Sequence, residues 1–335
     1  MRKYFLMAVL FLMSAESLFA ADIKIGSCVY TFNDAYMTRY RNAMAAEAEK
    51  NGVNLTILNS QNSQGTQNEQ VDEFIANGVD ALIINPVDRT DVAEIIEKAK
   101  AANIPVVFVN REPPEALLGS YEKTYYVGSN AEESGKLSGE IIVEYFKNHP
   151  EADKNHDGKI QFVMLKGENG HQDMIARSRF SVETIENSGA FKPVELASAL
   201  ANWDKFQAMT IMNAFIMSIG TDEIEAVIAN NDEMALGAVE ALKANDFNKG
   251  DKEFFIPVVG VDGNAGAIDA MNKNEIIGTV FQNAEAQGSA AVKIAISAAK
   301  NLPVDKNNTG FDVVNTKYIW VPYEKITPEI LKKGE

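Results

Sequence analysis

The chain has 335 residues, of which 46% are hydrophobic and 23% charged, which is the composition of a globular protein and not of a disordered, collagen-like or coiled-coil chain. The length is about twice the ~150 residues of a typical domain and predicts two lobes. Lys and Arg number 31 against 47 Asp and Glu, and the formal net charge of −16 argues against binding to nucleic acid because it repels phosphate backbones.

The first 20 residues have the pattern of a cleaved export signal. Arg2 and Lys3 form a charged start, residues 4–13 are apolar, and Leu18-Phe19-Ala20 resembles a cleavage site. The apolar run is too short for a spanning helix, which needs roughly 20 residues. An uncleaved anchor or a buried first helix is the alternative. We predict an exported protein whose residues 1–20 are removed.

From residue 23 onwards, short β-branched segments alternate with longer amphipathic ones. The first half has strand-like runs at residues 23–30, 54–60, 80–86 and 104–110, separated by helix-like segments such as 34–50. Near-continuous apolar strands between helices are typical of parallel β-α-β units with both faces of the sheet covered. The single cysteine, Cys28, lies in the first run, so we expect a buried and unreactive thiol.

The same pattern then starts again. Strand-like runs at 160–167, 193–200, 225–231 and 257–262 alternate with helix-like segments at about 172–187, 204–218 and 232–244. A strand at 276–282, a helix near 284–299 and a strand at 316–323 follow. No Pro- or Ser-rich linker separates the two halves, which favours several chain crossings over a single tether.

The sequence therefore predicts an α/β fold with two doubly wound parallel-sheet lobes joined by a multi-strand hinge. We assign residues 21–129 and 283–319 to the N-terminal lobe. Residues 130–282 and 320–335 form the C-terminal lobe in this prediction.

Polar side chains follow the predicted strands at their carboxyl ends, where open parallel sheets bind ligands. They include Asp34, Tyr36, Asn110, His171, Asp173, Arg177, Trp203, Asn231, Asp262 and Gln282. Amides, carboxylates and arginine make paired hydrogen bonds to vicinal hydroxyls, and aromatic faces cover the C–H patches of a pyranose. Singly, each residue has a structural alternative: Asp34 and Asp232 suit helix N-caps, Asn110 a turn, and Trp203 a core.

Residues 153–161 match most of a calcium-binding loop. Asp153, Asn155 and Asp157 stand at positions one, three and five, Gly158 at six, the Lys159 carbonyl at seven and Gln161 at nine. Position twelve is Met164 and not the expected bidentate Glu. The segment is either a solvated turn or a loop whose last carboxylate comes from elsewhere in the chain. We predict a structural Ca²⁺ with no catalytic role.

Several longer motifs are close to those of a known family. They are VVFVNREPP (106–114), YYVGSN (125–130), IQFVMLKGE (160–168), GHQDMIAR (170–177), VIANNDEMALGAVEALK (227–243) and VVGVD (258–262). Through them the chain resembles the galactose/glucose-binding group of the ribose-type periplasmic sugar-binding proteins. The resemblance implies the periplasmic binding protein type I fold and a periplasmic monomer. It also implies delivery of glucose or galactose to an ABC-type permease and, in some members, to a chemoreceptor.

The resemblance also implies roles for single residues. Tyr36 and Trp203 would sandwich the sugar ring, and Asp34 would accept hydrogen bonds from its distal hydroxyl in either epimer. The remaining hydroxyls and the ring oxygen would be bound by Asn110, His171, Asp173, Arg177, Asn231 and Asp262. Glu225 would supply the missing Ca²⁺ ligand. Two positions differ from the family: Tyr36 replaces Phe, and Gln282 replaces a shorter Asn, so the preference between the two hexoses stays open.

Other functions compete with this prediction. A glycoside-processing enzyme could use carboxylates such as Asp34 and Asp262 with His171, but no motif with catalytic spacing is present. A lactose-repressor-type regulator shares the two-lobed core but needs an N-terminal helix-turn-helix and a basic face. A binder of a pentose, inositol or signalling sugar would keep the fold and change the ligand. We predict a binding protein and not an enzyme, in which the two lobes close around one monosaccharide.

Overall fold

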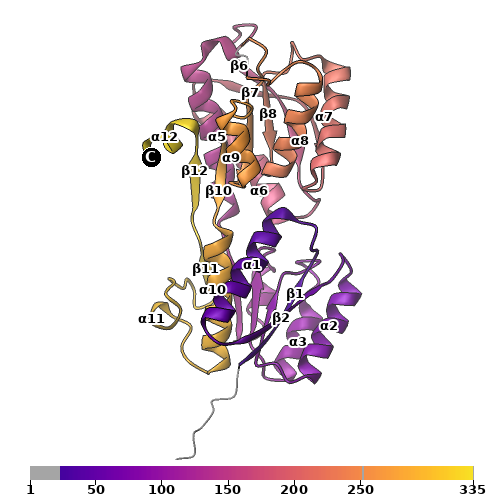
Figure 1. The fold of residues 1–335 in the computed structure, drawn as a ribbon, viewed down its shortest axis with the longest axis vertical. Helices are drawn as coiled ribbons and strands as arrows, with labels where there is room; N and C mark the ends of the chain where they lie inside the picture. The colour runs from indigo at the N-terminus through magenta and orange to yellow at the C-terminus, as the bar shows by residue number, and fades with distance from the viewer. Residues whose placement is uncertain (1–22, 251–252, 335) are drawn as a thin grey trace, which may run out of the picture.

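The computed structural model describes residues 23–250 and 253–334, so the predicted export signal at 1–20 lies outside the described residues (Figure 1). The chain forms two lobes stacked along the long axis of the molecule, each with a six-stranded sheet between helices (Figure 1). None of the helices in these two ranges is long and apolar enough to cross a membrane.

The N-terminal lobe has an all-parallel sheet with the strand order β11-β5-β4-β3-β1-β2. Its strands are β1 (Lys24–Val29), β2 (Asn54–Asn59), β3 (Ala81–Ile84), β4 (Val106–Val109), β5 (Thr124–Gly128) and β11 (Tyr318–Trp320). Its helices are α1 (Ala35–Lys50), α2 (Gln64–Ala76), α3 (Ala93–Ala101), α4 (Glu115–Leu118), α10 (Ala284–Ala299) and α11 (Lys306–Thr309).

Both faces of this sheet are buried because its central strands are apolar at every position. In β3, Ile83 packs toward α1 and α10, whereas Leu82 and Ile84 pack toward α2 and α3. Cys28 lies on the second face and is fully buried, and burial raises the pKa of its thiol to about 12. The expected burial of this thiol is confirmed, and its raised pKa disfavours the thiolate, which is the reactive form.

The C-terminal lobe repeats this arrangement with the order β12-β10-β9-β8-β6-β7, in which β12 alone is antiparallel to its neighbour. Its strands are β6 (Lys159–Lys166), β7 (Lys192–Leu200), β8 (Ala226–Ala229), β9 (Val258–Asp262), β10 (Gly278–Gln282) and β12 (Tyr323–Ile326). Its helices are α5 (Ala131–Asn148), η1 (Pro150–Ala152), α6 (Gln172–Asn187), α7 (Lys205–Ile219), α8 (Asp232–Ala244), α9 (Ala265–Asn272) and α12 (Pro328–Gly334). Helices α5 and α6 cover one face and α7, α8 and α9 the other.

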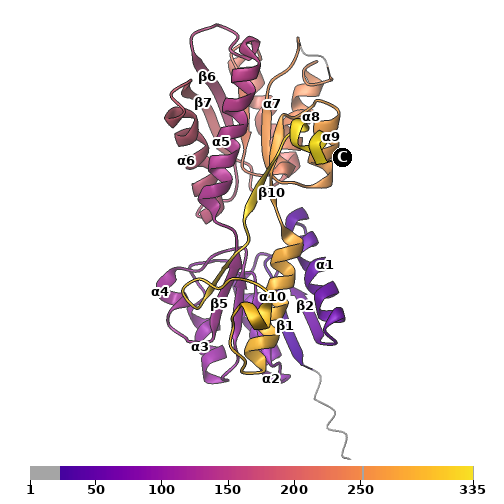
Figure 2. The ribbon, with the colours of Figure 1, turned by 90° about the vertical axis from the view of Figure 1, so that its left-hand side faces the viewer.

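Three segments join the lobes: they follow β5, follow β10 and connect β11 to β12 (Figure 2). Residues 316–323, predicted as one strand, are two strands in different sheets. Pro322 separates them, and proline cannot donate a ladder hydrogen bond. The lobe boundary expected between residues 319 and 320 falls inside β11. At the hinge, Gln287 Nε2 donates to Ser129 Oγ over 2.8 Å, and Ser129 Oγ donates to the Val321 carbonyl over 2.6 Å.

Each sheet reverses its strand order beside its first strand, between β1 and β3 and between β6 and β8. Such a reversal opens a crevice at the carboxyl ends of the strands, where open α/β sheets bind ligands. The two lobes turn these ends toward each other, because residues from both line one cavity. The fold therefore places the predicted polar side chains at the boundary between the lobes.

Candidate functional site

All ten side chains predicted at strand ends line a single cavity between the lobes. The space between the lining atoms measures about 340 Å³, open solvent at its mouth included. Its lining consists of Tyr30, Asp34, Tyr36, Asn110, Arg111, His171, Asp173, Arg177, Trp203, Asn231, Asp262 and Gln282. The sequence analysis missed Tyr30 and Arg111. Tyr30 directly follows β1, and Arg111 directly follows Asn110. A search for polar residues just beyond the strand ends could therefore have found both.

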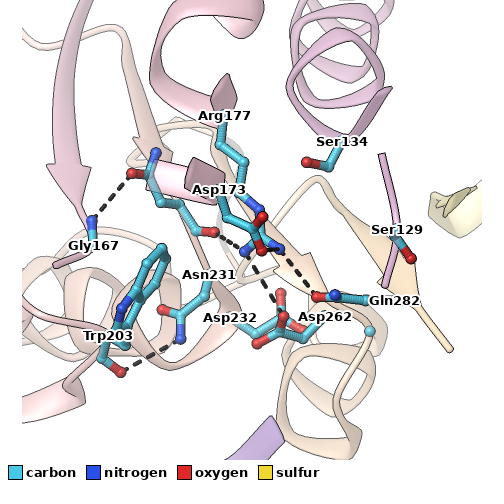
Figure 3. Close-up of polar contacts among 12 residues, drawn as sticks. Ser129, Ser134, Gly167, Asp173, Arg177, Trp203, Asn231, Asp232, Asp262 and Gln282 are labelled. Carbon is cyan, nitrogen blue, oxygen red and sulfur yellow. Dashed lines mark hydrogen bonds and ion pairs between the residues drawn. The ribbon is translucent and has the colours of Figure 1, made fainter. Parts of the chain in front are cut away.

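Arg177 on α6 is the centre of the polar network (Figure 3). Its side chain is 4% exposed, and Nη1 donates to the Asn230 carbonyl over 2.7 Å. Nη2 lies 3.0 Å from Asp173 Oδ2, from Gln282 Oε1 and from the Tyr323 hydroxyl. Since these partners come from α6, β10 and β12, the guanidinium connects three elements of the C-terminal lobe beneath the cavity.

Two buried carboxylates face this arginine. Asp173 is ion-paired to Arg177, and burial raises its pKa in spite of that pair. Asp262 lies 4.0 Å from Arg177 Nη1 and is 5% exposed, and its carboxylate accepts no hydrogen bond from the part of the chain that the structure describes. Burial raises the pKa of Asp262 well above its usual range, and neighbouring Asp232 adds to the shift. This carboxylate needs donors from a ligand.

Three of the predicted residues cap helices at the cavity wall. Asp34 caps α1, with Oδ1 accepting from Met37 N over 2.8 Å and Oδ2 from the Tyr30 hydroxyl over 2.5 Å. His171 caps α6 through Nδ1, which accepts from Asp173 N over 3.1 Å. Burial and nearby arginines lower the pKa of His171. The ring is therefore neutral and carries its proton on Nε2, as a donor.

Helix α8 is capped by Asn231, and the cap expected at Asp232 is wrong. The Asn231 side chain accepts from Met234 N over 3.0 Å, and its Nδ2 lies 3.4 Å from the Trp203 carbonyl (Figure 3). Asp232 begins the helix one residue later and is fully buried, accepting from Thr279 Oγ1 over 2.6 Å and from Asn264 N over 2.8 Å. Burial raises the pKa of Asp232 to about 6.

Aromatic rings reach the cavity from both lobes, Tyr36 from α1 and Trp203 from the turn before α7. Trp203 depends on Gly167, because a Cβ added there would lie 2.1 Å from Trp203 Cη2. Three lining residues have left-handed backbones: φ is 60° at Asn110, 65° at Trp203 and 127° at Asp262. Non-glycine residues adopt such angles at a cost, and backbone strain of this kind is found at functional sites as well as in turns.

Direct contacts hold the lobes together beside the cavity. Arg111 in the N-terminal lobe is 2.5 Å from Glu168 in the C-terminal lobe, and its guanidinium lies 3.8 Å from the centre of the Tyr30 ring. Gln172 Nε2 donates to the Asn110 carbonyl over 2.8 Å, and Arg39 Nη1 donates to the Asp262 carbonyl over 3.3 Å. The structure is thus a closed form of the two lobes.

The predicted calcium loop follows η1 and includes the first three residues of β6, and none of its residues lines the cavity. Asp153 accepts from Asp157 N over 3.2 Å and from Gly158 N over 3.0 Å. Gly158 has φ +73°, which suits the turn at position six. Lys159 Nζ is 2.6 Å from Asp157 Oδ2. Across residues 23–250 and 253–334, no three His, Cys, Asp or Glu side chains gather as metal ligands.

Glu225 nevertheless joins both ends of this loop. It is 1% exposed and precedes β8, and its two oxygens accept from Lys154 N over 2.7 Å and from Gln161 N over 3.0 Å. Gln161 Oε1 is buried and has no hydrogen-bond partner among the described residues. An unpartnered buried oxygen beside carboxylate, amide and carbonyl oxygens is compatible with the oxygen-only ligand set of Ca²⁺.

Comparison with known proteins agrees with this architecture. Residues 25–303 match the model of the periplasmic binding protein domain. The D-galactose/methyl-galactoside binding periplasmic protein MglB of Haemophilus influenzae is 41% identical over 288 residues, covering 86% of this chain and 85% of the relative. A putative rhizopine-binding protein of Rhizobium meliloti is 34% identical over 306 residues, covering 90% of this chain and 89% of the relative.

A solved structure is similar over nearly the whole chain. It is an ABC transporter solute binding protein from Bacillus halodurans with bound myo-inositol, with a TM-score of 0.75 and 32% identity, covering 94% of this chain and 97% of the other. These three similar proteins are named for binding a solute, and this chain is likewise a binding protein rather than an enzyme. The chain belongs to the periplasmic binding protein family.

Proposed function

We propose that this protein captures one monosaccharide, D-glucose or D-galactose, in the cavity between its lobes and delivers it to an ABC-type permease. Asp262 carries the proposal, because its carboxylate is 5% exposed and accepts no hydrogen bond from any described residue. A ring of hydroxyls provides the donors that it lacks. Tyr36 and Trp203 supply aromatic faces from opposite lobes, and the similarity to the galactose-binding relative supports a hexose.

Binding of the ligand is coupled to closure of the lobes. Asp34 and Asn110 belong to the N-terminal lobe, whereas Asp173, Arg177 and Asp262 belong to the C-terminal lobe. A ligand can bond to both groups at once only when the lobes are closed, so binding favours the closed state. A sugar that lacks one hydroxyl would leave a buried group unpaired and bind more weakly.

The proposed function is tested by calorimetric titration of ligand-free protein with D-glucose, D-galactose, D-ribose and myo-inositol. We expect a Kd in the micromolar range or below for at least one hexose, which corresponds to about −8 kcal/mol or better. Myo-inositol is included because a similar solved structure contains it. Tighter binding of ribose or inositol than of both hexoses would contradict the proposed ligand.

The ion pair between Arg111 and Glu168 is expected to stabilise the closed state. Glu168→Gln should weaken sugar binding by about two- to five-fold, because a pair with one exposed partner contributes ~0.2–1 kcal/mol. The loss should shrink at high salt, which screens the wild-type pair. Calorimetry at two salt concentrations measures both effects.

Glu183→Gln is the matched control for this prediction. Glu183 lies in the same lobe and pairs with Arg179 on the surface, away from the cavity. It should leave sugar affinity unchanged at either salt concentration. Equal affinities for Glu168→Gln and wild type would show that the ion pair does not favour closure.

We also propose that the loop at 153–161 binds a structural Ca²⁺. The ligands would be Asp153, Asn155, Asp157, Gln161, the Lys159 carbonyl and Glu225. The unpartnered Gln161 Oε1 supports the site, although Lys159 must then release Asp157 Oδ2. The ion would neutralise the carboxylates of the loop and fasten it to the segment before β8.

Removal of Ca²⁺ should lower the stability of the protein. At a thousandfold excess over Kd, a bound ion stabilises the fold by about 4 kcal/mol, so chelation should lower the melting temperature by roughly 6 °C. In Glu225→Gln the chelator should have little effect, whereas the exposed neighbour in Glu223→Gln should leave the wild-type response intact. A melting temperature of the wild type that does not respond to chelation would contradict the metal site.

The family and the predicted signal at 1–20 support a periplasmic location. We propose that the mature protein starts near residue 21 and acts as a monomer. A chemoreceptor is a second proposed partner for the closed form, in addition to the permease. Both partners would recognise the closed form if they contact surfaces of the two lobes at the same time.

A further inference from the structure

Several polar atoms of the cavity wall have no hydrogen-bond partner among the described residues, and the hydroxyl of Tyr36 is one of them. The residue is 7% exposed and lines the cavity, and its hydroxyl oxygen is buried without a hydrogen-bond partner among the described residues. Buried hydroxyls are nearly always paired, because a buried polar atom without a partner loses its bonds to water. If the ring served only as an apolar surface, phenylalanine would avoid this cost.

Tyr40, one helical turn later, shows what a structural tyrosine does on the same helix. Its hydroxyl donates to the Gln287 carbonyl over 3.1 Å, and its ring meets the Tyr36 ring edge-on with centroids 6.2 Å apart. Both residues are buried on α1 and face α10 or the cavity. Tyr40 therefore joins two helices, whereas the Tyr36 hydroxyl has no such partner.

The surroundings of Tyr36 are polar, and the side-chain nitrogen of Gln282 is a donor that the described residues leave unused. Burial raises the pKa of the Tyr36 hydroxyl, and the nearby Tyr40, Tyr323, Asp262 and Asp173 raise it further, so the hydroxyl remains a protonated donor. Arg177 Nη2 has two hydrogens for three acceptors within 3.0 Å, one of them Gln282 Oε1. The Gln282 side-chain nitrogen makes no hydrogen bond to any described residue, and Gln282 also lines the cavity.

We infer that the Tyr36 hydroxyl contacts the ligand, donating a hydrogen bond to a sugar oxygen at the end of the cavity formed by Arg177 and Gln282. This inference rests on the proposed function and adds a determinant of specificity to it. Tyr36 would then recognise the ring substituent as well as stack on the ring. A ligand that lacks an oxygen at this end of the cavity could not accept this hydrogen bond and would leave the Tyr36 hydroxyl unpaired.

Tyr36→Phe tests the inference because it removes one oxygen and keeps the ring. The affinity of the tighter-bound hexose should fall by about three- to ten-fold, the range expected for one hydrogen bond. The melting temperature of the ligand-free protein should stay the same or rise, since an unpaired buried hydroxyl is lost. Tyr40→Phe is the matched control and should lower the melting temperature while keeping the affinity.

Deoxy analogues locate the contact. Wild type and Tyr36→Phe are titrated with the parent hexose and with analogues that lack the oxygen at carbon 1, 2 or 6. The loss of affinity caused by Tyr36→Phe should disappear for one analogue and persist for the others, because a double-mutant cycle isolates the two groups that interact. We expect that analogue to lack the oxygen nearest Gln282, so Gln282→Asn should weaken the parent more than this analogue.

The outcomes separate this inference from the proposed function. If neither hexose but myo-inositol or ribose binds, the proposed hexose is wrong, and Tyr36→Phe is judged on the ligand that does bind. If none of the four binds, the proposed function and the inference both fail. If wild type binds and Tyr36→Phe binds within twofold of it, or loses affinity equally for all analogues, the hydroxyl is not a ligand contact and the inference is overturned.

Discussion

Arg177→Met should cause the largest loss of both stability and binding in this protein. The arginine is 4% exposed and bonds to the Asn230 carbonyl, Asp173 and Gln282. Its removal would leave buried carboxylates without a counter-charge, which costs about 3–5 kcal/mol of unfolding free energy. Sugar affinity should fall by at least about 30-fold, since truncating a buried charged partner costs ~2–5 kcal/mol. Urea unfolding and calorimetry measure the two effects.

The pH dependence of Arg177→Met gives an independent check. Arg177 lowers the pKa of Asp173 and of Asp262, while burial raises both, so its loss should raise the two pKa values further. A folded state with raised carboxyl pKa values binds protons that the unfolded state releases. The stability deficit of the variant should therefore be smaller at pH 5 than at pH 8.

Arg179→Met is the matched control, two residues along the same helix. Arg179 is 65% exposed and pairs with Glu183 on the surface. Its removal should change the unfolding free energy by less than about 0.5 kcal/mol and leave sugar affinity unaltered. Similar stabilities for the two variants would show that the carboxylates around Arg177 are not held by its charge.

Gly167→Ala should weaken sugar binding although residue 167 does not line the cavity. The added methyl group would lie 2.1 Å from Trp203 Cη2, so the indole must leave its position at the cavity wall. Overpacking of this kind costs about 1–3 kcal/mol, and a cost of that size on binding corresponds to a loss of affinity of roughly 5- to 150-fold. Calorimetry gives the affinity, and tryptophan fluorescence reports the displaced ring.

Two further variants separate displacement of the indole from a general effect of alanine. Gly65→Ala in α2 adds a methyl group whose nearest neighbour is Ser63 Oγ at 3.9 Å, so affinity should stay the same and stability should not fall. In a Trp203→Phe background, Gly167→Ala should cause a smaller loss of sugar affinity, because phenylalanine lacks the second ring of the indole. Equal penalties in both backgrounds would disprove steric displacement of Trp203.

The sequence predicted most of the fold because the strands are buried on both faces and are therefore apolar without interruption. Residues 81–84 and 226–229 show this most clearly. The strand at residues 124–128 escaped prediction because Tyr, Gly and Thr interrupt its apolar run. The division of 316–323 between two sheets depends on where the lobes lie in space, which local pattern does not contain.

The lining of the cavity followed from one rule, that ligands bind beyond strand ends, and the rule located ten residues. It did not reveal how these residues are used. Asn231 and Asp232 are neighbours, yet one caps α8 and lines the cavity, whereas the other is buried behind it. Gly167 also escaped, because its importance comes from the close approach of Trp203 in space. Such effects depend on tertiary packing and leave no periodic signal.

The three crossings between the lobes have a consequence for how the polypeptide can be divided. Strands β11 and β12 are supplied by residues 318–326, and each completes a different sheet. Helix α10 packs on the sheet of the first lobe although it follows the whole second lobe in the chain. No single cut therefore yields an intact lobe, and both sheets stay incomplete until nearly the entire polypeptide has left the ribosome. Two bodies that move separately in function thus depend on a shared C-terminal segment to fold.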